Sequence, residues 1–555
     1  MLSRALTLLL ASALAIGCSS EGSNGGGGGT GAVGSQGSVD DSGPGEVDGT
    51  ATSGAEASGT NGTSMSDPTG GGPTDGGPTG GETEVSTSDS GSGSTGEGDD
   101  PVGPSCELIE CNGDVVWSRR YGNSVVSASS EAVTAIATDP AGNTVIGGTI
   151  NGIADFGDLG TIEGPGAGFV AQVGPDGELQ WVRELSVVGD AAGLSVRSIA
   201  VDDDGSAVVV GSATGELIVD GQTLEGSGSI TVLKFDENGS LSSGQLFGSQ
   251  SGLNAAHAVA TDEEGRIGVV GEFRNSVHFG GNQMSALGGA QDVFVAVFDP
   301  DLNHVWSRHF GDDAAQTGHG VGFTEGGDVA VSLRNWGTVS FGGAESHTTT
   351  GLASMVVARL EADDGEEVWS RQYAPSAGLG APLPRIVATP DAIYLGTYSS
   401  EVESIEFEFD FGLGPSDGLS HVVRLDPNGN AQWDRPITGL RGGVLGLARD
   451  SGDGLLIAGL IEGTVDFGNG PLSSTGRDGF VAKYDAHTGD LIWGRLVTDD
   501  DQQTVAQQSH GVSTDAAGHV YVGGSFNGVI DFGDGDLVSS GGFGGADGFL
   551  AKLMP

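Results

Sequence analysis

Trp181-Val182-Arg183 is one copy of a Trp-x-Arg pattern that recurs along the chain at an almost constant interval. The copies are Trp117-Ser118-Arg119, Trp181-Val182-Arg183, Trp306-Ser307-Arg308, Trp369-Ser370-Arg371, Trp433-Asp434-Arg435 and Trp493-Gly494-Arg495. Halfway along the one double gap, Ser243-Gly244-Gln245 stands as a degenerate seventh copy. Successive copies then lie 60 to 64 residues apart. A repeat of this length fixes the architecture of the chain.

Other elements keep the same period. A largely apolar segment recurs once in each repeat before a turn, and it predicts a buried β-strand. The segments are Phe169-Val170-Ala171, Ile230-Thr231-Val232, Phe294-Val295-Ala296, Met355-Val356-Val357, His421-Val422-Val423, Phe480-Val481-Ala482 and Phe549-Leu550-Ala551. The turns are rich in Asp, Asn and Gly, as in Asp426-Pro427-Asn428-Gly429, which is typical of hairpins. Each repeat therefore predicts about four short strands, which make one blade of a β-propeller.

The two ends of the repeat region complement each other. The chain ends at Pro555, directly after the strand predicted over residues 549–553, so the last repeat lacks its Trp strand. The first Trp strand, residues 115–121, precedes the first full repeat. We therefore expect an all-β fold, a single seven-bladed β-propeller over residues 106–555, in which the N-terminal strand completes the last blade. Closure of this kind removes exposed sheet edges.

One repeat carries a resemblance to a known family. Its three parts are Asp515-Ala516-Ala517-Gly518-His519-Val520-Tyr521-Val522-Gly523-Gly524, Ile530-Asp531-Phe532-Gly533 and Phe549-Leu550-Ala551-Lys552-Leu553. They resemble the repeats of bacterial β-propeller proteins of the SBBP type, and the resemblance extends from residue 111 to the end. It implies a propeller at the cell surface. The family has no shared catalytic residues that could be assigned here.

The N-terminus has the features of an export signal: Arg4, an apolar run over residues 5–16, and a small residue before a cysteine. The apolar run is too short to span a membrane. Ala15-Ile16-Gly17-Cys18 resembles the lipobox of bacterial lipoproteins. The resemblance implies a lipoprotein signal peptide over residues 1–17 and an acylated Cys18, and Ser19 then favours the outer membrane. The alternative is an ordinary cleaved signal peptide.

The composition of residues 18–105 predicts a disordered linker. They consist mainly of Gly, Ser, Thr, Asp, Glu and Pro, with almost no large apolar side chain. Such a segment buries too little apolar surface to offset the entropy lost on ordering. After the linker, Cys106 and Cys111 are the only cysteines besides Cys18. In an oxidising compartment they could form a small-loop disulfide.

Charge and motifs limit the functions that fit. With 75 Asp and Glu against 21 Lys and Arg, the chain repels nucleic acid and anionic lipid, so membrane contact is expected through the lipid anchor only. No cofactor is predicted, and metal binding is left open. The acidic runs Asp202-Asp203-Asp204-Gly205 and Asp499-Asp500-Asp501 could offer oxygens to calcium, but such residues are more often plain turn residues.

Two motifs bear on catalysis. Asp-Phe-Gly, which is also a protein-kinase motif, occurs four times, and the other kinase motifs are missing from the sequence. The repetition indicates the end of a strand in each repeat that contains it. Residues 484–493 resemble the tryptophan-docking motif of quinoprotein dehydrogenase propellers and of outer-membrane assembly scaffold lipoproteins, although the Cys-x-x-Cys-His haem motif is missing. We therefore expect a non-enzymatic binding or scaffolding module whose partner is an unknown envelope protein or glycan. The alternative is an enzyme of quinoprotein-like or polysaccharide-acting type.

Alignment of the repeats also predicts a candidate site. In each repeat a strand leads into an Asp-rich turn, and Asp262 marks the start of this turn in one repeat. The residues two and four positions before Asp262 and its equivalents are small in every repeat, except for Ile386. A strand face restricted to small residues is typical of the innermost strand, where blades crowd together. Five residues before the turn lie Thr134, Arg197, His257, His319, Arg385, Leu445 and His510. Equivalent positions of a propeller form a ring, so we expect Arg197, His257, His319, Arg385 and His510 to gather at one mouth of the central channel, as a positive or metal-binding patch. Alternatively, each histidine caps its own strand through the backbone.

Overall fold

The computed structural model describes residues 112–122, 130–226, 228–250, 254–349, 353–373, 383–399, 407–418, 420–438, 441–498, 506–540 and 545–555. Cys18, Cys106, Cys111, the signal peptide and the linker lie outside these residues, so the predictions made for them stay predictions. Within the described residues, no helix is long and apolar enough to cross a membrane.

Three antiparallel sheets contain four strands each. The first comprises β10 (Ala255–Thr261), β11 (Ile267–Phe273), β14 (Asp292–Phe298) and β15 (His304–Phe310). The second comprises β16 (Gln316–Phe323), β17 (Val329–Asn335), β20 (Ser354–Leu360) and β21 (Glu367–Tyr373). The third comprises β32 (Gln507–Thr514), β33 (Val520–Phe526), β36 (Asp547–Leu553) and β1 (Val115–Tyr121).

Two larger sheets of eight strands each span two repeats. The first holds β2 (Ser130–Thr138), β3 (Thr144–Asp155), β4 (Thr161–Val173), β5 (Leu179–Val201), β6 (Ala207–Val219), β7 (Gln222–Thr223), β8 (Ile230–Phe235) and β9 (Leu241–Phe247). The second holds β22 (Leu383–Thr389), β23 (Ala392–Ser399), β26 (Ser420–Leu425), β27 (Ala431–Ile437), β28 (Arg441–Arg449), β29 (Gly454–Asp466), β30 (Pro471–Asp485) and β31 (Leu491–Val497). The long strand β5 ends one repeat and begins the next.

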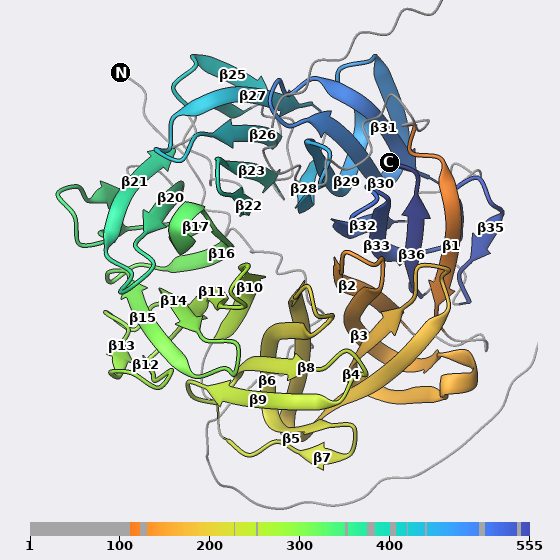
Figure 1. Ribbon diagram of the computed structural model, residues 1–555, viewed down its shortest axis with the longest axis horizontal. Helices are drawn as coiled ribbons and strands as arrows, with labels where there is room; N and C mark the ends of the chain where they lie inside the picture. The colour runs from red at the N-terminus through yellow and green to blue at the C-terminus, as the bar shows by residue number, and fades with distance from the viewer. Residues whose placement is uncertain are drawn as a thin grey trace, which may run out of the picture. The chain divides into compact units, whose positions relative to one another are not determined.

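The sheets stand around a central axis, as the blades of a β-propeller do (Figure 1). The innermost strands of successive repeats contact one another in a closed ring, in the order β2, β5, β10, β16, β22, β28, β32 and back to β2. The apolar segments predicted once per repeat form β4, β8, β14, β20, β26, β30 and β36. Each of these strands is the third of its repeat, and the predicted apolar segment within it is buried. The sequence-based prediction of these strands is confirmed.

The N-terminal strand β1 pairs antiparallel with β36 at the other end of the chain. The register runs from Val115 opposite Leu553 to Tyr121 opposite Gly548. Trp117 and Tyr121 are buried, and Arg120 Nη1 lies 2.6 Å from Asp547 Oδ2, a fully buried carboxylate. The outer strand of the last sheet thus comes from the beginning of the described domain.

The Trp-x-Arg copies join neighbouring repeats. In β27, the indole Nε1 of Trp433 donates to Ala486 O (3.1 Å), and Arg435 Nε donates to Gly489 O (2.7 Å), both in the outer turn of the next repeat. Gly489 has a φ of +72°, and a Cβ there would lie 2.7 Å from the Trp433 ring. The indole contact with a turn carbonyl recurs for Trp117, Trp181, Trp306 and Trp369. In the degenerate copy, Gln245 Nε2 donates to Leu302 O (2.8 Å) in place of the arginine.

Four short hairpins and two 3-10 helices complete the fold. They are β12 (Ser276–Val277) with β13 (Met284–Ser285), β18 (Thr338–Val339) with β19 (His347–Thr348), β24 (Phe407–Asp410) with β25 (Pro415–Gly418), β34 (Val529–Asp531) with β35 (Asp536–Val538), η1 (Gly157–Leu159) and η2 (Glu325–Gly327). Asp-Phe-Gly ends strands here, as the sequence predicted. Gly533 N–H donates to Asp531 Oδ1 (2.6 Å), and the buried Phe532 packs on Phe549 with ring centroids 5.3 Å apart.

Candidate functional site

The innermost strands pack too closely for larger side chains. A Cβ on Gly320 of β16 would lie 2.7 Å from Ile386 Cγ2 of β22. A Cβ on Gly446 of β28 would lie 2.9 Å from the Cα of Gly511 in β32. The small residues that the alignment of the repeats placed on the innermost strand are therefore explained, and the prediction is confirmed.

The predicted ring residues have a structural feature that the sequence did not reveal. In six of the innermost strands, the pairing with the second strand shifts by one residue, and the extra residue is the ring residue itself. These residues are Thr134, Arg197, His257, His319, Leu445 and His510. Arg385 is the exception, because it pairs regularly with Gly396. A bulge of this kind leaves its extra residue out of the ladder and re-aims the side chain, often beside a functional site.

The described structure brings the predicted ring residues together. Arg197 Nη1 lies 3.2 Å from His257 Nδ1, and the His257 and His319 rings are 5.3 Å apart between centroids. Because a guanidinium only donates hydrogen bonds, His257 Nδ1 is the acceptor, so the neutral ring carries its proton on Nε2. His257 Nε2 is buried and makes no hydrogen bond with the described residues, although Glu272 Oε1 is 3.5 Å away.

The other two histidines also contact side chains. His319 Nε2 lies 2.8 Å from Thr317 Oγ1, and His510 Nε2 lies 3.2 Å from Ser525 Oγ. The contacts that the structure shows for these histidines are thus with side chains, and the alternative that they cap their own strands through the backbone stays a prediction.

Arg385 is electrostatically central to the ring. Its positive charge contributes to lowering the pKa of His257, His319 and His510, although burial is the largest cause in each case. Burial and the nearby Arg197 lower the pKa of Arg385 itself to about 10, so it stays charged at neutral pH. Arg197 is exposed to solvent and stays charged as well.

These pKa shifts determine how the ring is charged. The pKa of His510 falls to about 4, and those of His257 and His319 fall below the ordinary histidine value. The histidines are therefore neutral at pH 7, and the positive charge that the sequence predicted comes from the arginines alone. Among the described residues, no group of three or more His, Cys, Asp or Glu side chains could hold a metal ion, so the prediction of a metal-binding patch is wrong for this ring.

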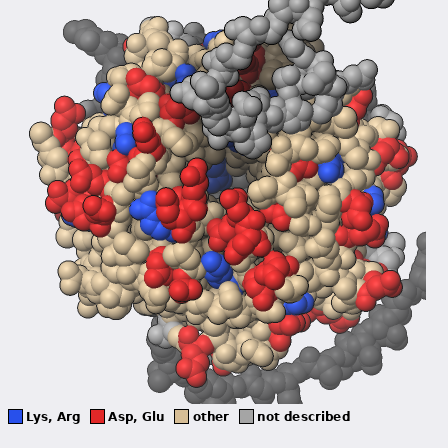
Figure 2. All heavy atoms as spheres, viewed as in Figure 1, with Lys and Arg blue, Asp and Glu red and all other residues tan. Residues whose placement is uncertain are grey.

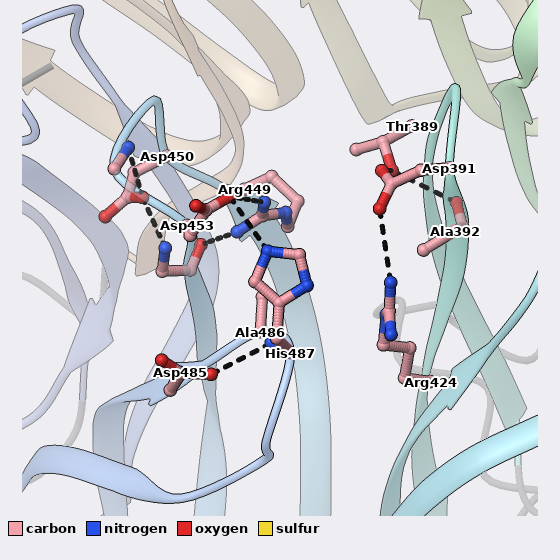
Figure 3. A network of polar contacts seen from close by, with 12 residues as sticks. Thr389, Asp391, Ala392, Arg424, Arg449, Asp450, Asp453, Asp485, Ala486 and His487 are labelled. Atoms are coloured by element: carbon pink, nitrogen blue, oxygen red, sulfur yellow. Dashed lines mark hydrogen bonds and ion pairs between the residues drawn. The ribbon is translucent and has the colours of Figure 1, made fainter. Parts of the chain in front are cut away.

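The other end of the innermost strands, roughly 16 Å away at 3.3 Å per residue, carries the acidic turns. Figure 3 shows Arg424 directed at Asp391, and Arg449 and His487 directed at Asp453. Asp202 likewise faces Lys234, with Oδ2 and Nζ 3.4 Å apart. Asp202 thus already has a cationic partner, which favours the turn interpretation over calcium. Asp499, Asp500 and Asp501 lie outside the described residues.

No family model and no curated protein matches this chain. Several solved structures resemble its fold. The quinohemoprotein alcohol dehydrogenase of Comamonas testosteroni is 11% identical, with 82% of this chain and 78% of that chain covered and a TM-score of 0.37. The Dos1 propeller is 8% identical, with 80% and 97% covered and a TM-score of 0.34. Chaetomium thermophilum Sqt1, bound to the N-terminus of ribosomal protein L10, is 11% identical, with 80% and 100% covered and a TM-score of 0.35.

Likenesses this weak carry no argument about function, and the resemblance to SBBP repeat proteins stays a prediction.

His510 provides a pH-dependent prediction. Between its unfolded pKa near 6.5 and its folded pKa of about 4, the unfolded chain binds more protons than the folded one. Stability should therefore fall as the pH decreases from 6.5 to 4, by about 3 kcal/mol from this group alone. Urea denaturation at pH 7, 5.5 and 4 should show that His510→Gln reduces this loss. Equal losses in both proteins would mean that His510 titrates normally.

Proposed function

We propose that this chain is an exported, lipid-anchored, seven-bladed propeller, closed by β1, that acts as a binding or scaffolding module at the cell envelope. The observation that carries the binding role is the convergence of Arg197, His257, His319, Arg385 and His510 at the axis. Bulges on rigid, closely packed strands direct four of these side chains there. A preorganised set of donors loses little entropy when it binds a partner.

The direction of the histidine pKa shifts favours binding over acid–base catalysis. A general base works best with a pKa near the operating pH. Burial instead lowers the pKa of all three histidines, to about 4 for His510. They suit a role as fixed, neutral hydrogen-bonding groups.

The experiment that tests this function compares retention with turnover. Immobilised full-length protein should retain a protein or glycan component from envelope extracts, and the double variant Arg197→Gln/Arg385→Gln should not retain it. The enzymatic alternative is tested with the same preparation, by dye reduction after addition of a quinone cofactor and by release of reducing ends from polysaccharides. Turnover at roughly 1 s⁻¹ or faster, the ordinary range of enzymes, would overturn the binding role.

The anchor makes a separate prediction. If Cys18 carries the lipid, Cys18→Ala should move the protein from the membrane fraction to the soluble fraction or leave it with its signal peptide attached. Cell fractionation and mass spectrometry of the mature N-terminus measure this. A native protein that begins after residue 18 and carries no lipid would contradict the anchor and leave the ordinary signal peptide.

A further inference from the structure

Arg385 lacks a hydrogen-bond acceptor among the residues that the structure describes. Elsewhere, the arginines of the Trp-x-Arg copies donate to turn carbonyls, and the basic residues of the third strands face turn carboxylates, as Lys483 faces Asp450 at 2.8 Å. Arg385 makes no hydrogen bond or ion pair with the residues that the structure describes, and its Nε is inaccessible to solvent. A buried donor without an acceptor is costly and calls for an explanation.

The surroundings of Arg385 increase that cost. Arg197 is close enough for its charge to lower the pKa of Arg385, and the charges of Arg197, Arg385 and Arg334 all act on His319. The acidic group beside them is Glu272, which lies against His257 and whose charge acts on Arg197. One described carboxylate thus stands beside the guanidinium groups of Arg197 and Arg385, so this part of the ring has a positive surplus that a bound anion would neutralise.

The donors around Arg385 fit an oxyanion. A guanidinium presents its N–H groups as a planar fork that matches a carboxylate, and hydrogen bonds between charged groups are the strong ones. The Nε2–H of the neutral His257 lies 3.5 Å from Glu272 Oε1, and its Nδ1 accepts from Arg197, so His257 positions the Arg197 guanidinium. We propose that the axis ring binds a single carboxylate group of its ligand, held by Arg385 and Arg197. This inference depends on the proposed binding function and specifies its ligand chemistry.

The charge of the whole chain limits the size of the anion. On the face shown in Figure 2, basic atoms lie in a hollow near the centre, and on the surface around it Asp and Glu are more widespread than Lys and Arg. An acidic surface repels a polyanion as a whole, but it leaves a recessed positive site open to one carboxylate on an otherwise neutral ligand. Nucleic acids and polyuronates are therefore poor ligands for this site.

Calorimetric titration of the full-length protein at pH 7 tests the inference. One pair of probes is D-glucuronate and neutral D-glucose, and the other is N-acetyl-alanyl-alanine and its C-terminal amide. If the site binds sugar acids, D-glucuronate should bind at least tenfold more tightly than D-glucose. If it binds peptide C-termini, N-acetyl-alanyl-alanine should bind at least tenfold more tightly than its amide. Loss of a charged hydrogen bond corresponds to roughly 10- to 100-fold in affinity, so Arg385→Gln should weaken binding by this factor.

Melting temperatures separate a ligand-binding role from a structural one. Arg385→Gln removes a half-buried charge that has no partner among the described residues, so without ligand it should melt at a higher temperature than the native protein. Arg385→Lys, which keeps the charge but not the planar fork of donors, should also bind weakly. The matched control is Arg308→Gln, whose guanidinium donates to Asp364 O (2.8 Å) at the outer strand β15 and should leave binding unchanged.

Two results would overturn the inference. One is equal affinity of the native protein for both acids and their neutral partners. The other is a lower melting temperature of Arg385→Gln together with unchanged binding by Arg385→Lys, which would make Arg385 a structural residue. If envelope components are still retained by the native protein after either result, the binding function stands and only its ligand chemistry is wrong.

Discussion

Deletion of residues 112–121 should abolish the cooperative unfolding transition of the domain. The deletion removes β1, exposes the hydrogen-bonding edge of β36 and takes away the buried rings of Trp117 and Tyr121. It also strips Asp547, a fully buried carboxylate, of Arg120. Loss of a buried aromatic side chain costs about 3–5 kcal/mol, and so does loss of one partner of a buried ion pair. The sum reaches the whole stability of a typical domain, about 5–15 kcal/mol.

Differential scanning calorimetry measures this loss. The matched control is deletion of residues 86–95, an equal length of the predicted linker, which should leave the transition in place. A synthetic peptide of residues 112–121 should restore the transition of the truncated protein, because strand addition to an open edge recovers the ladder hydrogen bonds. A truncated protein that melts as the native one does would show that the ring does not depend on β1.

Trp433→Ala should cost about 3–5 kcal/mol, the usual range for a buried Trp replaced by Ala. The indole is 5% exposed, donates to Ala486 O and covers Gly489 in the next repeat, so its loss opens the contact between two repeats. Urea denaturation followed by far-ultraviolet circular dichroism measures the change.

Trp336→Ala is the matched control for this substitution. Trp336 lies outside the Trp-x-Arg register, is 36% exposed and contacts Arg334, whose guanidinium carbon is 4.6 Å from the ring centroid. We expect a cost below about 1 kcal/mol, since exposed cation–π contacts contribute about 0.5–1 kcal/mol. Equal losses for the two variants would mean that the Trp-x-Arg contacts do not hold neighbouring repeats together.

The Trp-x-Arg period, together with the apolar segments and turns that share it, predicted the strands of each repeat. This prediction follows from local chemistry, because an apolar run between Gly-rich turns forms a buried strand wherever it occurs. The degenerate copy at Ser243-Gly244-Gln245 was also identified by spacing, and Gln245 indeed replaces the arginine at Leu302 O. Spacing could not predict that Gly113, ahead of β1, would accept the hydrogen bond of Arg495.

The sequence by itself also determined which residues share the ring, because equivalent positions of a repeat occupy equivalent places. Only the tertiary structure decided what those residues do there. The bulge at His257, its neutral tautomer and the absence of a described acceptor for Arg385 depend on strand register and on residues about 60 or more positions away, such as Arg197. Burial then lowered the histidine pKa values and turned a predicted cationic or metal-binding patch into neutral donors around two arginines. Solvation and long-range charge are properties of the folded chain, so no local pattern of residues encodes them.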